Sequence, residues 1–258
     1  MIDESALWLV GGLLLAGMLL AYEIGLRLHS RLRRLADAPG KSESSDEGYV
    51  LSGIFGLLAL LMAFAFSLAL DRYEERRALV VTEANAIVTL DERLGLLGDD
   101  GGALRTDLAR YAAARVSVGQ AAEPSHYRKA LAQADALRDH LGADLYAGLR
   151  AQPMDARTTL LAQAFDAVGD VATARRAARS ARLPGAVLGL LALYCLVGAA
   201  ILGYTIAASK ARHRIASGLF FVLLTAAFII VLDLDRPRGG TITVPQTELE
   251  SAAAALVR

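Results

Sequence analysis

The sequence has 258 residues, of which 55% are hydrophobic and 21% are charged, and its formal net charge is zero. Because the mean hydropathy is positive (+0.41) although charged residues are common, the apolar residues must be clustered, as they are in membrane spans. A pI near 6.9 gives no basic footprint for nucleic acid, so we expect no nucleic-acid partner. The single cysteine, Cys195, excludes a disulfide framework and a cysteine-based metal cluster.

Four apolar stretches are long enough to cross the hydrocarbon core of a bilayer, which needs about 20 helical residues. They cover residues 6–26, 50–70, 185–206 and 216–232. The N-terminal letters MIDES are acidic and no A-x-A cleavage site follows, so we expect the first stretch to be a retained anchor rather than a signal peptide. The fourth ends at LDLDRPRGG, where charges and Pro237 stop the helix.

Residues 71–183 read as helices that leave the membrane. No helix breaker occurs between Gly56 and Gly95, and apolar side chains recur there every seven residues, which is typical of a coiled-coil seam. The seam consists of Phe66, Tyr73, Val80, Ile87 and Leu94. Further helices are predicted over 103–120, from Ser125, and from Pro153 through Pro184 into the third span.

The predicted fold is therefore an all-α integral membrane protein with four transmembrane helices. A helical bundle is inserted between the second and third helices, and these two helices continue out of the membrane. Residues 1–70 hold the first two transmembrane helices with a short basic loop, and 71–183 form the bundle. Residues 184–235 hold the last two transmembrane helices, and 236–258 form a short C-terminal tail.

The stretch FAFSLALDRYEERRALVVTEANAI, residues 64–87, combines an F-x-F-S run, an R-Y-x-x-R-R pattern and an E-A-N-A-I block. It resembles the bestrophin-like family of bacterial membrane proteins. The segments ARRAARSARLPGAVLGLLALYCLVGAAILGY and FVLLTAAFIIVLDLDRPRGGTITV are similar to the family pattern around the third and fourth spans. The similar segments cover residues 48–97 and 166–249.

The resemblance implies an ion channel, because bestrophins are pentameric anion channels with a helical domain between the second and third spans. It implies a homo-oligomer, a pentamer by the family pattern, that passes an inorganic ion. Phe64 followed by Arg72 and Tyr73 reproduces a bestrophin spacing, which places Phe64, and by its aromatic character Phe66, at a hydrophobic constriction with Ser67. In an oligomer, a ring of such apolar side chains around the pore can close it to ions by excluding water. Alternatively, both phenylalanines pack against neighbouring helices or lipid.

Charged and polar residues beyond the second and fourth spans form a second candidate group, an ion or salt-bridge girdle. Its members are Arg72, Arg76, Glu83, Asn85, Asp233 and Asp235. In a ring of copies Glu83 would form an acidic girdle; alternatively it pairs with Arg76 or Arg77 while Asn85 sets helix register. Asp233 and Asp235 either form salt bridges with nearby arginines such as Arg236 and Arg238 or coordinate an ion.

No enzyme, cofactor or metal site is predicted. The histidines are His29, His126, His140 and His213, and they show no H-x-x-x-H spacing. Neither a G-x-S-x-G motif nor a P-loop occurs. A non-conducting membrane-anchored module that binds a partner or senses envelope conditions is therefore the alternative to a channel.

Membrane orientation follows from the basic residues of the two short loops, which are Arg27, Arg31, Arg33, Arg34, Lys41, Lys210, Arg212 and Arg214. The positive-inside rule makes these loops cytoplasmic, which puts the bundle and both termini on the outer side of the inner membrane. The basic flanks of the bundle and the resemblance to bestrophins, whose helical domain is cytosolic, favour the opposite orientation.

Overall fold

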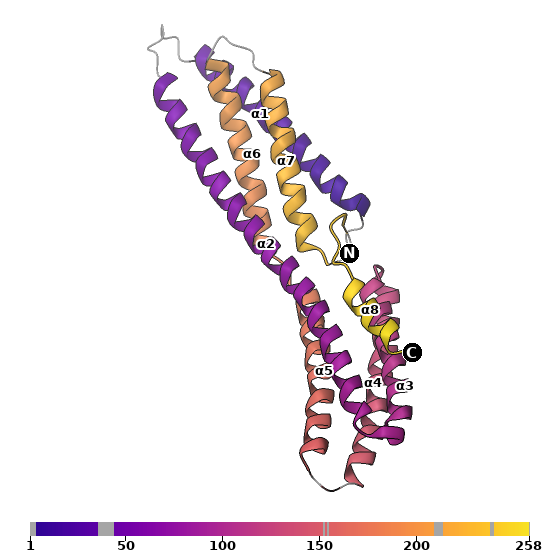
Figure 1. Ribbon diagram of the computed structural model, residues 1–258. Helices are drawn as coiled ribbons and strands as arrows, with labels where there is room; N and C mark the ends of the chain where they lie inside the picture. Colours follow the sequence, from indigo (N-terminus) through magenta and orange to yellow (C-terminus); the bar gives the residue numbers. More distant parts are fainter. Residues whose placement is uncertain are drawn as a thin grey trace. The chain divides into compact units, whose positions relative to one another are not determined.

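The computed structural model describes residues 4–35, 44–151, 153, 155–208, 214–237 and 240–257. The helices are α1 (Glu4–Leu35), α2 (Ser44–Gly95), α3 (Gly102–Gln120), α4 (Pro124–Arg150), α5 (Ala156–Ser180), α6 (Gly185–Ala208), α7 (Arg214–Asp235) and α8 (Thr247–Ala255), with a short 3₁₀ turn η1 (Gly98–Gly101) (Figure 1). The described residues contain no strand, so the predicted all-α class is confirmed. The predicted loop residues Lys41, Lys210, Arg212, His213 and Arg238 lie outside the described residues.

Four helical stretches in the described chain are long and apolar enough to cross a membrane, as predicted. They are Leu7–Leu35, Gly48–Gly95, Arg214–Asp235 and a stretch, Ala156–Ala207, that joins α5 to α6. The chain divides into two compact units, a membrane unit of Met1–Asp71 and Arg182–Ile242 and a bundle unit of Arg72–Ala181 and Thr243–Arg258. The C-terminal residues, which the sequence presents as one tail, are thus shared between both units.

Within the membrane unit, α1 packs against α6 and α7 (Figure 1). Its buried residues Leu7, Leu14, Met18 and Tyr22 recur every three to four positions or multiples of that spacing, so they form one face of the helix. Gly25 allows the backbones of α1 and α6 to touch, because a Cβ at this position would collide with the carbonyl oxygen of Ala200. Small residues allow such close packing in membranes, where apolar burial gives little drive for helix association.

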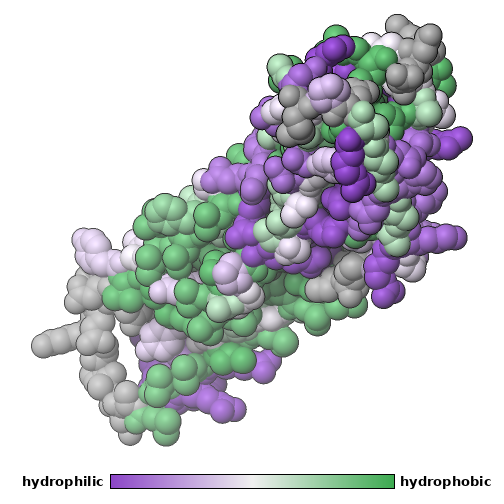
Figure 2. Space-filling model, turned by 90° about the horizontal axis from the view of Figure 1, so that it is seen from below, coloured by the Kyte–Doolittle hydropathy of each residue, from purple (hydrophilic) through white to green (hydrophobic). Residues whose placement is uncertain are grey.

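The membrane half of α2 is packed very differently. Among its side chains that the structure describes, Leu58, Ala65 and Ala69 are the buried ones, and these residues lie on one narrow stripe of the helix. Large apolar side chains on its other faces are exposed, as they are on the lipid-facing sides of α1 and α7. Figure 2 shows hydrophobic side chains gathered over one part of the surface and hydrophilic side chains over another.

The bundle unit is built on a single hydrophobic core. The predicted seam of α2 faces this core, since Val80, Ile87 and Leu94 are buried there. They meet buried side chains from α3, α4, α5 and α8, among them Tyr111, Leu141, Leu161 and Leu249. Each fully buried side chain of this size contributes about 1.5–3 kcal/mol of transfer free energy.

One boundary differs from the prediction. The helix predicted to run from the bundle into the third span is two helices, because α5 ends at Ser180 and α6 begins at Gly185. Pro184 explains the break, since proline disfavours helical geometry in the residue before it and is well suited to a position beside a helix N-terminus. The backbone N–H of Leu183, which has no helical partner at the break, donates to the Asp235 carboxylate at 2.8 Å. Both residues belong to the membrane unit.

Replacing Ile87 by alanine tests the assignment of the bundle core. Ile87 is fully buried, so we expect Ile87→Ala to lower the free energy of unfolding by about 2–5 kcal/mol. Val81→Ala on the same helix removes an exposed side chain and should change it by less than about 0.5 kcal/mol. Denaturant unfolding followed by circular dichroism measures both; equal losses would contradict this core.

Candidate functional site

The two phenylalanines of the predicted constriction lie on different faces of α2. Residues two apart on an α-helix are separated by roughly 200° around its axis. Phe66 lines an apolar groove of about 510 Å³ between α2 and α7, together with Phe55 and Met62 of α2 and Phe220 and Leu224 of α7. Phe66 is therefore the residue that faces a neighbouring span of its own chain.

Phe64 lies away from this groove and is the more exposed of the two, at 60% against 41% for Phe66. Leu57, Leu60 and Ser67 share the face of Phe64 by their spacing of three and four residues, and all are exposed. Asp71 follows one turn beyond Ser67 and is exposed as well. The structure thus groups Phe64 with Ser67 and separates both from Phe66.

Glu83 is completely buried in the bundle, between arginines of two other helices. Arg115 of α3 donates from Nε to its Oε1 at 2.5 Å, and Arg175 of α5 donates from Nη1 to its Oε2. Arg175 also donates to Oε1 of Gln246, which precedes α8, at 2.8 Å. One carboxylate therefore ties α2, α3 and α5 together and reaches the C-terminal segment through Arg175.

The charges of this cluster support one another. Burial disfavours the charge on Arg115, but the neighbouring Glu83 carboxylate and the Tyr111 hydroxyl outweigh it, so the pKa of Arg115 is raised. An acidic ring that attracts ions needs exposed carboxylates, whereas both oxygens of Glu83 are occupied by arginine. Glu83 is accordingly a salt-bridge residue in this chain, although its partners differ from Arg76 and Arg77.

The other girdle residues of the bundle unit have separate surroundings. Arg76 is buried and donates to the carbonyl oxygens of Ala178 and Ala181, both at 3.2 Å, so it caps the C-terminus of α5. Arg72 is half-buried, and Asn85 is exposed on α2. These residues therefore do not form one compact site within the bundle unit.

Asp233 and Asp235 end α7 and accept hydrogen bonds from the backbone. Asp233 accepts from the N–H groups of Thr241 at 2.9 Å and Ile242 at 3.0 Å, which folds the following turn back onto the helix. A Cβ at Gly240 would collide with the same carboxylate, so a larger residue there would displace Asp233 from these hydrogen bonds. Through these contacts and the hydrogen bond from Leu183 to Asp235, the two carboxylates hold the segments before α6 and after α7 against the end of α7.

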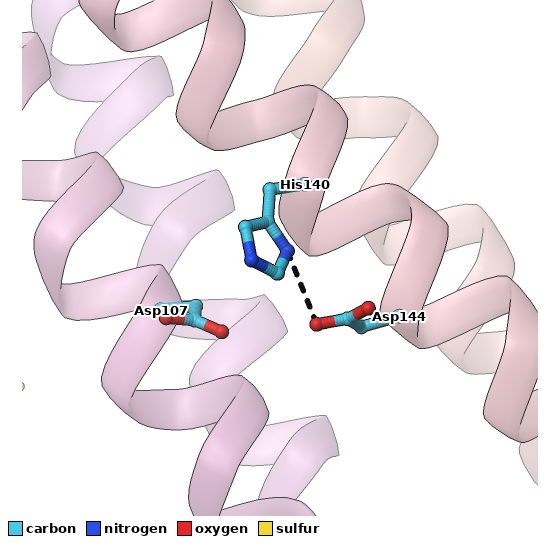
Figure 3. A group of neighbouring side chains, drawn as sticks. All are labelled: Asp107, His140 and Asp144. Atoms are coloured by element: carbon cyan, nitrogen blue, oxygen red, sulfur yellow. Dashed lines mark ion pairs between the residues drawn. The ribbon is translucent and has the colours of Figure 1, made fainter.

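A group of potential metal ligands lies on the surface of the bundle. Ligand atoms of Asp107 on α3 and of His140 and Asp144 on α4 lie within 4.8 Å of one another (Figure 3). His140 Nδ1 lies 3.1 Å from an Asp144 oxygen, and Asp107 pairs with Arg110 at 3.0 Å. The group could supply three ligands to a divalent cation, but Asp107 is already paired with Arg110 and both His140 and Asp144 are exposed, so we assign no metal to it. The sequence alone shows that His140 and Asp144 are one helical turn apart. It does not show that Asp107, on another helix, lies beside them.

Comparison with known proteins identifies the family. The model of the Bestrophin-like domain matches residues 20–249. This chain belongs to the Bestrophin-like family. No curated protein matches the sequence.

Solved structures of a bacterial bestrophin homologue from Klebsiella pneumoniae share the fold of this Bestrophin-like chain. One variant matches with a TM-score of 0.68 and 14% identity over 95% of this chain and 99% of that chain. Another gives a TM-score of 0.70 and 13% identity over 98% and 97% of the two chains. The structure solved by Zn-SAD phasing gives 0.66 and 14% over 93% and 96%. The Bestrophin-like fold thus extends over nearly the whole chain.

The partners of Glu83 were missed in the sequence, although Arg115 had a detectable signal. Leu108, Tyr111, Arg115 and Val118 follow the three- and four-residue spacing of a buried helical face, so this arginine falls among core positions. Arg175 and Gln246 carry no such signal, because they lie in polar stretches far along the chain. Only the folded bundle brings them together.

Glu83→Gln tests the charge cluster in this Bestrophin-like protein. It leaves two arginines without their carboxylate, and we expect a loss of about 3–5 kcal/mol in unfolding free energy. Asp91→Asn is the matched control on α2, because it breaks the more exposed pair with Arg105 and should cost about 1 kcal/mol or less. Combining Glu83→Gln with Arg115→Gln should cost less than the sum of the single changes. Additive effects would contradict the coupling.

Tyr111 beside this cluster provides a test at alkaline pH. Burial raises the pKa of its hydroxyl to about 12, with Arg115 opposing and Glu83 adding to the shift. An unfolded tyrosine ionises near pH 10, so the stability gained from neutral Tyr111 is complete below about pH 10 and is lost as the pH rises through about 12. Tyr111→Phe should flatten the alkaline fall in unfolding free energy. An unchanged slope would contradict the assignment.

Proposed function

We propose that this protein is an oligomeric ion channel of the bacterial inner membrane, in which the α2 helices of several copies line the path. Family membership supports the proposal, and the structures that share the fold are bestrophin homologues. Bestrophins are ion channels that work as oligomers. A non-conducting membrane module for partner binding or sensing is the alternative.

The exposed face of α2 is the observation that carries this proposal. A single chain with so few charged groups inside its spans cannot enclose a hydrated path, so a pore requires several copies. The face with Leu57, Leu60, Phe64 and Ser67 has no covering helix in the described membrane unit. Nothing lies within 4 Å of a Cβ built at Gly53 or Gly56, which leaves open space beside the same helix.

Phe64 is the residue we assign to a hydrophobic constriction. It is the bulkiest side chain on this face, and rings of apolar side chains can close a pore by dewetting. Phe66 lies in the groove with α7 and is assigned to packing. Asp71, beyond Ser67 on the face of Phe64, would form a ring of carboxylates around the path, and such rings favour cations.

Phe64→Ala tests the constriction, with Phe66→Ala as the matched control two residues away. We expect Phe64→Ala to increase ion flux through purified protein in liposomes several-fold, because a smaller side chain lets water and ions pass. Phe66→Ala should leave the flux per folded oligomer near that of the unsubstituted protein. Equal effects of the two changes would contradict the assignment of Phe64.

Potassium and chloride gradients in the same liposomes separate the ion classes. We expect a preference for potassium that Asp71→Asn weakens. A preference for chloride would overturn the role of Asp71. An intact oligomer that conducts neither ion, with or without Phe64→Ala, would favour the non-conducting module.

The proposed assembly is a homo-pentamer, by the family pattern, with its bundle and termini on the outer side of the inner membrane. Native mass spectrometry of the purified protein measures the number of copies, and a monomer would rule out an α2-lined path. Protease treatment of intact spheroplasts tests the orientation. The positive-inside rule predicts cleavage of the bundle, whereas protection would place it in the cytosol.

A further inference from the structure

A basic hollow lies at one end of α1 and α6 in the membrane unit. It has a volume of about 300 Å³ and is lined by His29, Ser30, Arg33 and Arg34 of α1 and by Ala207 of α6. These residues follow the apolar part of α1, which ends near Leu26, so they lie where a membrane-spanning helix reaches the headgroup layer. None of them belongs to the face of Phe64 or to the Glu83 cluster.

His29 is the aromatic polar side chain of this hollow. Both ring nitrogens, Nδ1 and Nε2, are buried and have no hydrogen-bond partner among the described residues. The ring stands edge-on to Tyr204 of α6, with the centroids 4.9 Å apart, which holds its orientation. A buried imidazole without a partner costs free energy, and a bound ligand that accepts a hydrogen bond would remove this cost.

Among the described residues, the charged side chains that line the hollow around His29 are all positive. Arg33 and Arg34 are exposed in the hollow, and within the described part of the chain neither forms an ion pair. The described ion pair of α1 joins Glu23 to Arg214 of α7 at 3.3 Å, so this carboxylate is already engaged. Guanidinium groups match the geometry of phosphate oxygens and bind them with paired hydrogen bonds.

We propose that this hollow binds a phosphate group, held by the guanidinium groups of Arg33 and Arg34 and by a hydrogen bond from His29. Basic pockets between transmembrane helices at the membrane surface bind the headgroups of anionic lipids, so the phosphate of such a lipid is the expected occupant. Free inorganic phosphate shares the same chemistry. The site does not depend on ion conduction and is compatible with either proposed function.

Native mass spectrometry of the detergent-purified full chain tests the site with three probes: phosphatidylglycerol, phosphatidylcholine and inorganic phosphate. We expect retention of phosphatidylglycerol, at least tenfold weaker binding in Arg33→Gln/Arg34→Gln, and weaker binding in His29→Phe, which keeps the ring against Tyr204. Arg27→Gln/Arg31→Gln is the control, because it removes the same charge from α1 outside the hollow and should have a small effect.

The outcomes separate the possible occupants. Competition by millimolar inorganic phosphate together with weak lipid retention would assign the site to free phosphate. Equal losses in the two double variants, or unchanged binding in both His29→Phe and Arg33→Gln/Arg34→Gln, would show only general attraction to basic residues and overturn the proposal. Retention of phosphatidylcholine equal to that of phosphatidylglycerol would overturn the preference for an anionic lipid.

Discussion

One helix, α2, has to be stable both in the hydrocarbon of the membrane and in water. Backbone polar groups inside hydrocarbon must be paired within the same segment, so the helix cannot break while it is in the membrane. In water the helix needs a packed apolar face, because helices in proteins gain most of their stability from tertiary packing. The uninterrupted helix Ser44–Gly95 meets both demands with one stripe of residues, which is buried in both units.

The two surroundings explain which side chains lie on the other faces of α2. In the bundle unit Val80, Ile87 and Leu94 enter the core, whereas in the membrane unit only the narrow stripe around Ala65 is buried. A water-soluble helix with such exposed apolar faces would aggregate, but in a membrane lipid or another copy of the chain can cover them. The exposed face of Phe64 is therefore compatible with an assembly of several copies, and a buried Phe64 would not have been.

The acidic side chains have different partners in the bundle unit and in the membrane unit. Glu83, Arg115 and Arg175 form a buried ion cluster, which adds little net stability when compared with apolar packing but strongly penalises any arrangement that separates its members. In the membrane unit, Asp233 and Asp235 accept backbone hydrogen bonds at the end of α7. These acidic groups therefore hold the chain in place with different partners, which are arginine side chains for Glu83 and backbone N–H groups for Asp233 and Asp235.

Hydrophobicity and periodicity alone determined the class of this protein, the four spans and the apolar seam of α2, because these features depend on neighbouring residues along the chain. The motif around Phe64 was sufficient to indicate the family. The packing of Phe66 rather than Phe64 against α7, the arginine partners of Glu83 and the lack of a described partner for His29 appear only in the tertiary structure. Each of these depends on which helix faces which, and side chains more than a helical turn apart in sequence meet only after the helices have packed.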